Sequence, residues 1–138
     1  MPKVRLSNDT KKTLGIWVEP WGEDYWMKSK EKFTIVTDTP KDSDPDEEPF
    51  EVVFHDQGAS VWVNTGYEAT VYDHSGNEVD CGHQRPIEVL RAWTEAFEAA
   101  ADRSDLTPEL QERVRSEAET MRWRLSRAEA AEQEAQDS

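Results

Sequence analysis

The sequence predicts a small antiparallel β-sandwich, or a small barrel, followed by a pair of helices, and three observations lead to this prediction. Apolar and polar residues alternate over the first 85 residues, which is the period of a half-buried strand. Turn residues interrupt this alternation about every eight to twelve positions. After Pro86 the apolar spacing becomes helical. We therefore expect a β domain over residues 1–85 and a helical hairpin with a frayed end over residues 86–138.

The strands are predicted from the alternation of apolar and polar side chains. Such alternation covers residues 3–6, 13–19, 33–37, 50–55, 60–64 and 67–72, with shorter segments at 25–27 and 78–81. Pro20 and Gly22 end the second of these strands, because a proline cannot donate to a central ladder. Residues 39–49 hold three prolines among acidic side chains, which predicts a long polar loop. About seven or eight short strands joined by hairpin-length turns are typical of a sandwich or small barrel.

Two helices are predicted after the β domain. In the first, from Ile87 to Ala101, apolar side chains recur on one side with charged residues between them. The second begins near Thr107, which suits an N-cap, with Pro108 at the first helical position. Its apolar residues fall within an arc of about 80° around the helix. This stripe consists of Leu110, Val114, Ala118, Met121, Leu125 and Ala128.

The narrow stripe on the second helix needs a surface to lie against, and two hypotheses cover it. It packs on the first helix to form a hairpin, or it pairs with a copy of itself or with another protein. Trp123 lies on the opposite side of the helix, and tryptophan is enriched where proteins bind one another. The candidate partner-binding residues are Leu110, Val114, Met121, Trp123 and Leu125.

The composition sets limits on partners and location. The formal net charge is -14 and the sequence pI is about 4.5, so phosphate backbones and anionic membranes would repel the chain. A basic partner is allowed, and the charge also favours solubility. No apolar run approaches the roughly 18 residues of a membrane helix. The first residues do not resemble a secretory signal and Cys81 is the single cysteine, so we expect a cytoplasmic protein.

Four segments of the β region follow a familiar pattern, at residues 6–10, 14–25, 28–33 and 61–64. They contain an asparagine in the first turn, a strand, and the tetrapeptide Glu-Pro-Trp-Gly at residues 19–22. This pattern resembles a group of small uncharacterised bacterial proteins, over about the first 80 residues and not the helices. The resemblance implies a shared β fold and no known activity, so it assigns no catalytic or binding residue.

The Glu-Pro-Trp-Gly tetrapeptide supports two interpretations. In one, neighbouring aromatic side chains and a carboxylate form a binding patch for a sugar, a base or a peptide. The candidate residues of that patch are Glu19, Trp17, Trp21, Tyr25, Trp26 and Trp62. In the other, Pro20 and Gly22 only make a turn and Trp21 covers the end of the sandwich. Trp17 and Trp62 then lie on an outer face that the helices cover.

Candidates for metal binding and catalysis are few. The soft metal ligands are His55, His74, Cys81 and His83. Cys81 and His83 are close in sequence, but the further His and Met that a copper site of this kind requires are not at suitable spacings. Ser60, Ser75 and Cys81 lack a recognisable nucleophile motif, and no glycine-rich phosphate loop is present. We therefore predict no metal and no cofactor, and an enzyme is the less favoured interpretation.

The function predicted from the sequence is a non-catalytic module that binds another protein or associates with itself. The alternative is a small-ligand binder or an enzyme, with a pocket between the Trp-rich sheet face and the helices. A third hypothesis, an antagonist of a basic partner, rests on the net charge alone.

Overall fold

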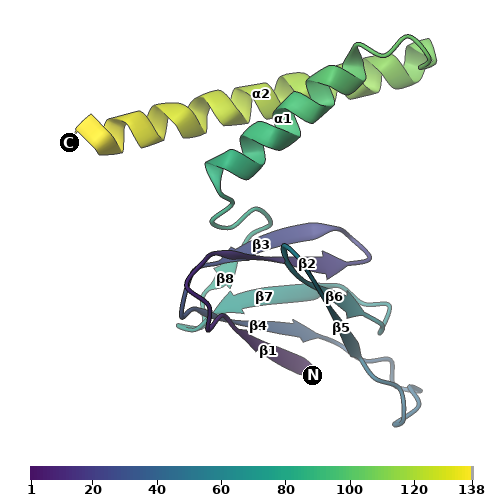
Figure 1. The fold of residues 1–138 in the computed structure, drawn as a ribbon. Helices are drawn as coiled ribbons and strands as arrows, with labels where there is room; N and C mark the ends of the chain where they lie inside the picture. The colour runs from purple at the N-terminus through teal and green to yellow at the C-terminus, as the bar shows by residue number, and fades with distance from the viewer. Residues whose placement is uncertain (138) are drawn as a thin grey trace. The chain divides into compact units, whose positions relative to one another are not determined.

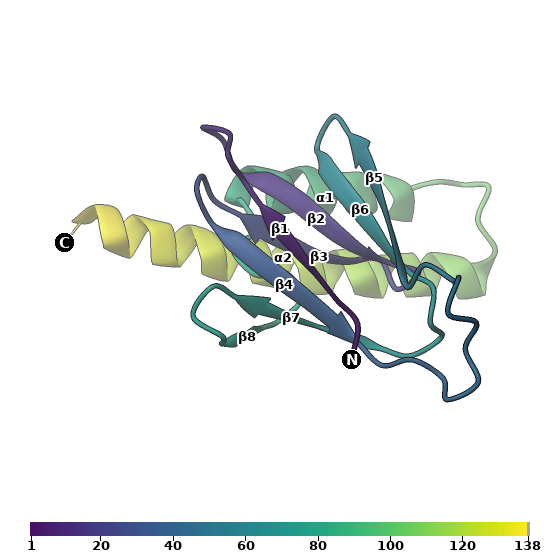
Figure 2. The same ribbon diagram turned by 90° about the horizontal axis from the view of Figure 1, so that it is seen from below.

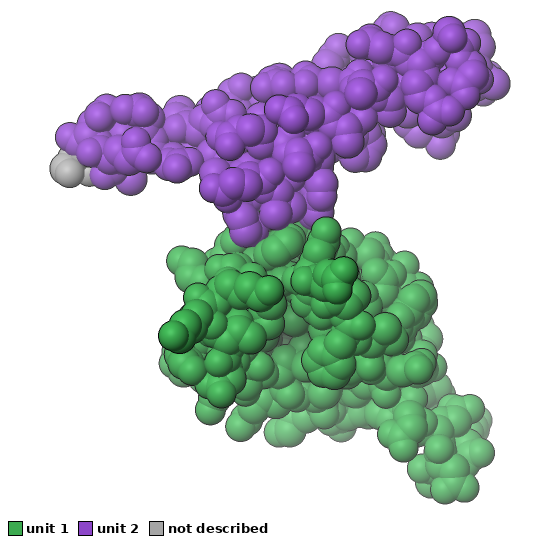
Figure 3. All heavy atoms as spheres, in the orientation of Figure 1, with its two compact units in different colours: residues 1–85 green, residues 86–138 purple. Residues whose placement is uncertain are grey.

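The computed structural model describes residues 1–137 and divides into two compact units, residues 1–85 and 86–138 (Figure 3). The first unit contains eight strands in two sheets. They are β1 (Lys3–Ser7), β2 (Leu14–Glu19), β3 (Glu23–Met27), β4 (Lys32–Thr37), β5 (Phe50–His55), β6 (Gly58–Val63), β7 (Ala69–Asp73) and β8 (Glu78–Val79). One sheet has the order β1-β4-β7-β8 and the other β3-β2-β6-β5 (Figures 1 and 2). The predicted β-sandwich is confirmed.

The core of this unit lies between the two sheets and is built from the inward-facing residues of each strand. Its buried members are Ile16, Val18, Tyr25, Met27, Phe33, Ile35, Ala59, Val61, Val63, Val71 and Val79. Phe33, Ile35 and Val61 are fully inaccessible to solvent. Each large apolar side chain buried in this way stabilises the fold by about 1.5–3 kcal/mol.

One pair of neighbouring strands departs from the expected antiparallel pairing. β2 and β6 run parallel, with Val18 opposite Val61, whereas every other ladder in the described chain is antiparallel. After β3 the chain enters the other sheet at β4 and returns at β5, so the β5–β6 hairpin meets β2 from its free side. Alternation within a strand predicts which face is buried, but it does not encode the partner or its direction.

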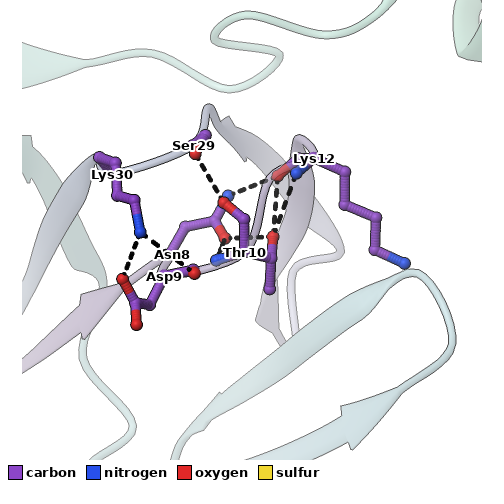
Figure 4. A network of polar contacts seen from close by, with 6 residues as sticks. All are labelled: Asn8, Asp9, Thr10, Lys12, Ser29 and Lys30. Atoms are coloured by element: carbon purple, nitrogen blue, oxygen red, sulfur yellow. Dashed lines mark hydrogen bonds and ion pairs between the residues drawn. The ribbon is translucent and has the colours of Figure 1, made fainter.

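A buried asparagine joins two loops at one end of the sandwich (Figure 4). Asn8 is 1% exposed, and its Nδ2 donates to the carbonyl oxygens of Lys12, at 2.8 Å, and Met27, at 2.9 Å. Its Oδ1 accepts from the backbone N–H and the hydroxyl of Thr10. Its own carbonyl accepts from the backbone N–H of Lys30 at 2.7 Å. A buried amide satisfied on both ends explains why an asparagine occupies this turn.

The second unit is a pair of helices, α1 (Ile87–Ala101) and α2 (Pro108–Asp137). Leu90 of α1 packs with Met121 and Leu125 of α2, so the hairpin is confirmed and the apolar stripe serves it. The hydroxyl of Thr107 accepts from the backbone N–H of Leu110 at 3.2 Å, as an N-cap does. α2 continues as a helix through the segment that was expected to fray.

Neither of these two helices, which are all the α-helices of the described chain, is long and apolar enough to cross a membrane.

Candidate functional site

The aromatic residues singled out in the sequence fall in two different places. Trp17, Trp26 and Trp62 lie on the outer face of the β3-β2-β6-β5 sheet, because they alternate with core residues. Tyr25 points the other way and is 4% exposed in the core. Trp21 lies in the turn that follows β2. A single patch containing all five aromatic side chains is therefore not formed within the sheet.

Two glycines on neighbouring strands leave room for aromatic rings to lie against the backbone of the outer face. Gly15 and Gly58 are register partners in the parallel pair. A Cβ atom on Gly15 would lie 2.6 Å from ring atoms of Trp17 and 3.0 Å from the ring of Trp26. The ring centroids of these two indoles are 5.3 Å apart with an edge-to-face angle of 73°. The His55 ring lies 5.3 Å from Trp17 on its other side. The rings thus form a row across the sheet.

The exposed part of this face centres on Trp62, whose exposed fraction is 40%. Its register partners are Glu19 of β2 on one side and Glu51 of β5 on the other. Val53, two residues further along β5, is 44% exposed. We call these four residues the Trp62 surface. An indole between two carboxylates suits a cationic group, which is attracted by the ring face and can pair with either acid.

Trp26 is held in place by a buried ion pair on the same outer face, at the β3 edge of the sheet. Arg85 donates to the two carboxylate oxygens of Asp24, from Nε at 2.8 Å and from Nη2 at 2.6 Å. The indole N–H of Trp26 donates to the same carboxylate at 2.7 Å. Burial raises the pKa of Asp24, but the hydrogen bonds from Arg85 and Trp26 outweigh it and hold the pKa below its usual value. Trp26 therefore stabilises the fold and does not offer its N–H to a ligand.

Trp21 and Tyr25 line a separate cavity of about 260 Å³, at the edge where β3 approaches β7 and β8. The Tyr25 hydroxyl donates to Glu23 at 2.8 Å. Burial, and to a smaller extent this hydrogen bond, raises the pKa of Tyr25. Cys81 also lines the cavity, and burial raises the pKa of its thiol. A thiol held in its protonated form is a poor nucleophile. The cavity can hold a ligand, but it does not activate Cys81.

His55 and Ser60 are close enough to suggest a catalytic pair, but the hydrogen bonds indicate otherwise. His55 Nε2 lies 3.2 Å from the Ser60 hydroxyl oxygen. The backbone N–H of Gln57 donates to His55 Nδ1 at 3.3 Å, which makes Nδ1 the acceptor. In a neutral imidazole the other nitrogen then carries the proton. His55 Nε2 donates to Ser60 and cannot also remove its proton as a general base.

The part of the chain that the structure describes contains no cluster of side chains suited to a metal ion. Within residues 1–137, no group of three or more His, Cys, Asp or Glu side chains could hold a metal ion. His83 instead packs against the core residue Phe33, with ring centroids 5.7 Å apart. The backbone carbonyl of His83 accepts from the backbone N–H of Trp26 at 2.8 Å.

The candidate partner-binding residues of α2 are divided between the hairpin and solvent. Met121 and Leu125 are buried against α1, with exposed fractions of 8% and 0%, and Val114 is half-buried. Leu110 and Trp123 are exposed. The Arg127 guanidinium lies 4.9 Å above the Trp123 ring, in a cation–π contact within the same helix. Only Leu110 and Trp123 of this set remain open to a partner.

Two members of the Trp62 surface were not recognised in the sequence. Glu51 and Val53 alternate with the core residues of β5, and that alternation is the one signal that places them on the outer face. Their position beside Trp62 follows from strand pairing, which a single sequence does not reveal.

No protein-family model, curated protein or solved structure matches this chain. The resemblance to small bacterial proteins with a Glu-Pro-Trp-Gly tetrapeptide stays a prediction.

Proposed function

We propose that this protein is a non-catalytic interaction module that binds a basic segment of a protein partner at the Trp62 surface. The observation that carries the proposal is the exposed indole of Trp62, which lies between Glu19 and Glu51 on the outer face of its sheet. Tryptophan is among the residues that contribute most to binding energy in protein interfaces. An arginine or lysine over this ring gains a cation–π contact and a carboxylate partner together.

The charge of the whole chain supports a basic partner. With a net charge of -14, the protein attracts a cationic segment over distances limited by the Debye length, about 8 Å at physiological ionic strength. Such attraction raises the association rate and makes it fall as salt is added. The proposed setting is a bacterial cytoplasm, which the use of a single cysteine favours.

The proposal is tested by selecting peptides from a random library on the full chain and measuring their affinities. We expect the selected peptides to carry arginine or lysine beside an apolar residue. Trp62→Ser should weaken their binding by about 30-fold, which corresponds to the ~2 kcal/mol typical of a central interface tryptophan. Trp21→Ser is a matched control, because Trp21 is also 40% exposed but lies in the turn after β2.

A second variant tests the role of the carboxylates. The double variant Glu19→Gln and Glu51→Gln keeps the shape of the surface and removes both charges. We expect it to bind the same peptides more weakly and to lose most of the salt dependence of their association. Selected peptides without basic residues, or equal losses for Trp62→Ser and Trp21→Ser, would contradict the proposal.

The same experiment distinguishes two other candidate functions. The cavity of about 260 Å³ favours a small-ligand site at Trp21 and Tyr25, with Glu23 at its rim. Binding lost with Trp21→Ser and kept with Trp62→Ser would assign recognition to that cavity. Light scattering on the full chain tests self-association, since a dimer that Trp62→Ser dissociates would make a second copy the partner.

A further inference from the structure

The outer face of the opposite sheet carries a group of basic side chains that the proposed function does not use. Lys3 and Arg5 lie two residues apart on the same side of the edge strand β1. Lys32 lies at the start of β4, which pairs with β1. Together with Thr34 and Tyr72 they line a groove of about 510 Å³, which we call the basic groove.

Strand register explains why these side chains gather. Arg5 lies opposite Thr34, and Thr34 lies opposite Tyr72, so these three residues form a row across β1, β4 and β7. Lys3 and Lys32 lie on either side of this row, because side chains two apart share a face of the sheet. Three positive charges therefore surround one threonine and one tyrosine.

The charges of the basic groove are not neutralised within the part of the chain that is described. Over residues 1–137, neither Lys3, Arg5 nor Lys32 forms an ion pair, although the sequence has 30 acidic and 16 basic residues. The one carboxylate that lines the groove is Asp73, and its Oδ1 accepts from the backbone N–H groups of the turn after β7. Uncompensated positive charges on one face repel one another, and a bound anion would relieve that repulsion.

We propose that the basic groove binds a small anion that carries two or more phosphate groups. Arg5 offers a planar fork that fits two phosphate oxygens, and the two lysines supply further positive charge. The hydroxyls of Thr34 and Tyr72 add donors at the centre. The groove volume of about 510 Å³ is in the range of small-molecule sites. The chain's net charge of -14 repels a long nucleic acid, while a compact anion meets only the local positive field.

The test is calorimetric titration of the full chain with inorganic tripolyphosphate at low and physiological salt. The double variant Lys3→Glu and Lys32→Glu should weaken binding at least about tenfold, because it reverses two of the three charges. The control is Lys41→Glu with Arg124→Glu, which makes the same change in net charge at exposed positions outside the groove. We expect the control to change the affinity by less than about threefold. Circular dichroism confirms that both double variants are folded.

Three results would overturn the proposal. Tripolyphosphate that does not bind at millimolar concentration would show that the groove is not an anion site. Equal weakening by the two double variants would mean that the net charge, and not the groove, governs binding. A single-stranded oligonucleotide that binds more tightly than tripolyphosphate would assign the face to nucleic acid. Trp62→Ser should leave tripolyphosphate binding unchanged, because Trp62 belongs to the other sheet.

Discussion

The carboxylates of Asp24 and Asp9 each pair with a basic side chain, and their burial decides what each contributes. The Asp24 side chain is 5% exposed and accepts from Arg85 and Trp26. The Asp9 side chain is 94% exposed and pairs with Lys30 at 2.6 Å. Breaking a buried pair by removing one partner costs about 3–5 kcal/mol, whereas exposed pairs contribute little. We expect Asp24→Ala to lower the free energy of unfolding by about 3 kcal/mol and Asp9→Ala to leave it nearly unchanged, measured by urea denaturation.

The effect of Asp24→Ala should depend on pH in a defined direction. The pKa of Asp24 is lower in the folded protein than its usual value near 3.8, so its ionised form stabilises the fold. This stability is fully present above about pH 5, declines as the pH falls past the unfolded pKa, and is gone below the folded pKa. The difference between the wild type and Asp24→Ala should therefore shrink in acid. A difference that stayed constant down to pH 2 would show that the charge of Asp24 is not what stabilises the fold.

At the scale of residues, the sequence predicts which face a side chain lies on but not its distant contacts. Alternation with core residues correctly placed Trp17 and Trp62 on an outer face. The ion pair of Asp24 and Arg85 was not predicted, because the two residues are 61 positions apart and only the docking of residues 81–85 against β3 joins them.

At the scale of elements, the parallel pair of β2 and β6 depends on two glycines. A Cβ atom on Gly58 would lie 1.9 Å from the carbonyl oxygen of Gly15, so an alanine there forces the strands apart. We expect Gly58→Ala to lower the free energy of unfolding by more than about 2 kcal/mol, as a steric clash in a packed region does. It should also weaken peptide binding at Trp62, which lies further along β6.

Gly76→Ala is the matched control for this substitution. Gly58 and Gly76 both have a positive φ, of 151° and 84°, but a Cβ atom on Gly76 would meet nothing within 4 Å. Gly76→Ala should lower the free energy of unfolding only by the backbone strain of alanine at this φ, about 1 kcal/mol. Thermal and urea unfolding of both variants measure the difference. Equal losses for Gly58→Ala and Gly76→Ala would mean that conformation, and not the close approach of two strands, requires glycine in β6.

Elements were predicted better than their pairing. Turn residues located the strands and Pro86 located the change to helices, because these signals are local. The partner of β2 on its free side was not predictable, since it follows from how the chain returns between sheets. On α2, the stripe was identified correctly, but helix lengths decided its use. α1 has 15 residues and α2 has 30, so α1 packs on Met121 and Leu125 and leaves the last turns of α2 exposed. Leu110 is exposed in the first turn of α2, next to the loop between the helices.

At the scale of the whole molecule, the two outer faces of the sandwich differ in charge and chemistry. The β3-β2-β6-β5 face presents an indole flanked by carboxylates, and the β1-β4-β7-β8 face presents three basic side chains. A chain with a net charge of -14 keeps these opposite fields apart by placing them on different sheets. The two proposed sites can therefore be tested separately, with variants of one sheet serving as controls for the other.

The two units should differ in how well each folds alone. Every buried residue of the sandwich core belongs to residues 1–85, as does the ion pair of Asp24 and Arg85. Over residues 86–137 the hairpin buries five hydrophobic residues, of which two are alanines: Leu90, Ala101, Ala118, Met121 and Leu125. Two helices with so small a core are marginal in water.

We expect residues 1–85 alone to unfold cooperatively in urea, and residues 86–138 alone to show weak, non-cooperative helicity by circular dichroism. Light scattering on residues 1–85 is the control for aggregation. A fragment 1–85 that aggregates or unfolds without a transition would mean that the sandwich requires the helices. A hairpin fragment that folds cooperatively, at a midpoint independent of its concentration, would mean that its own core is sufficient.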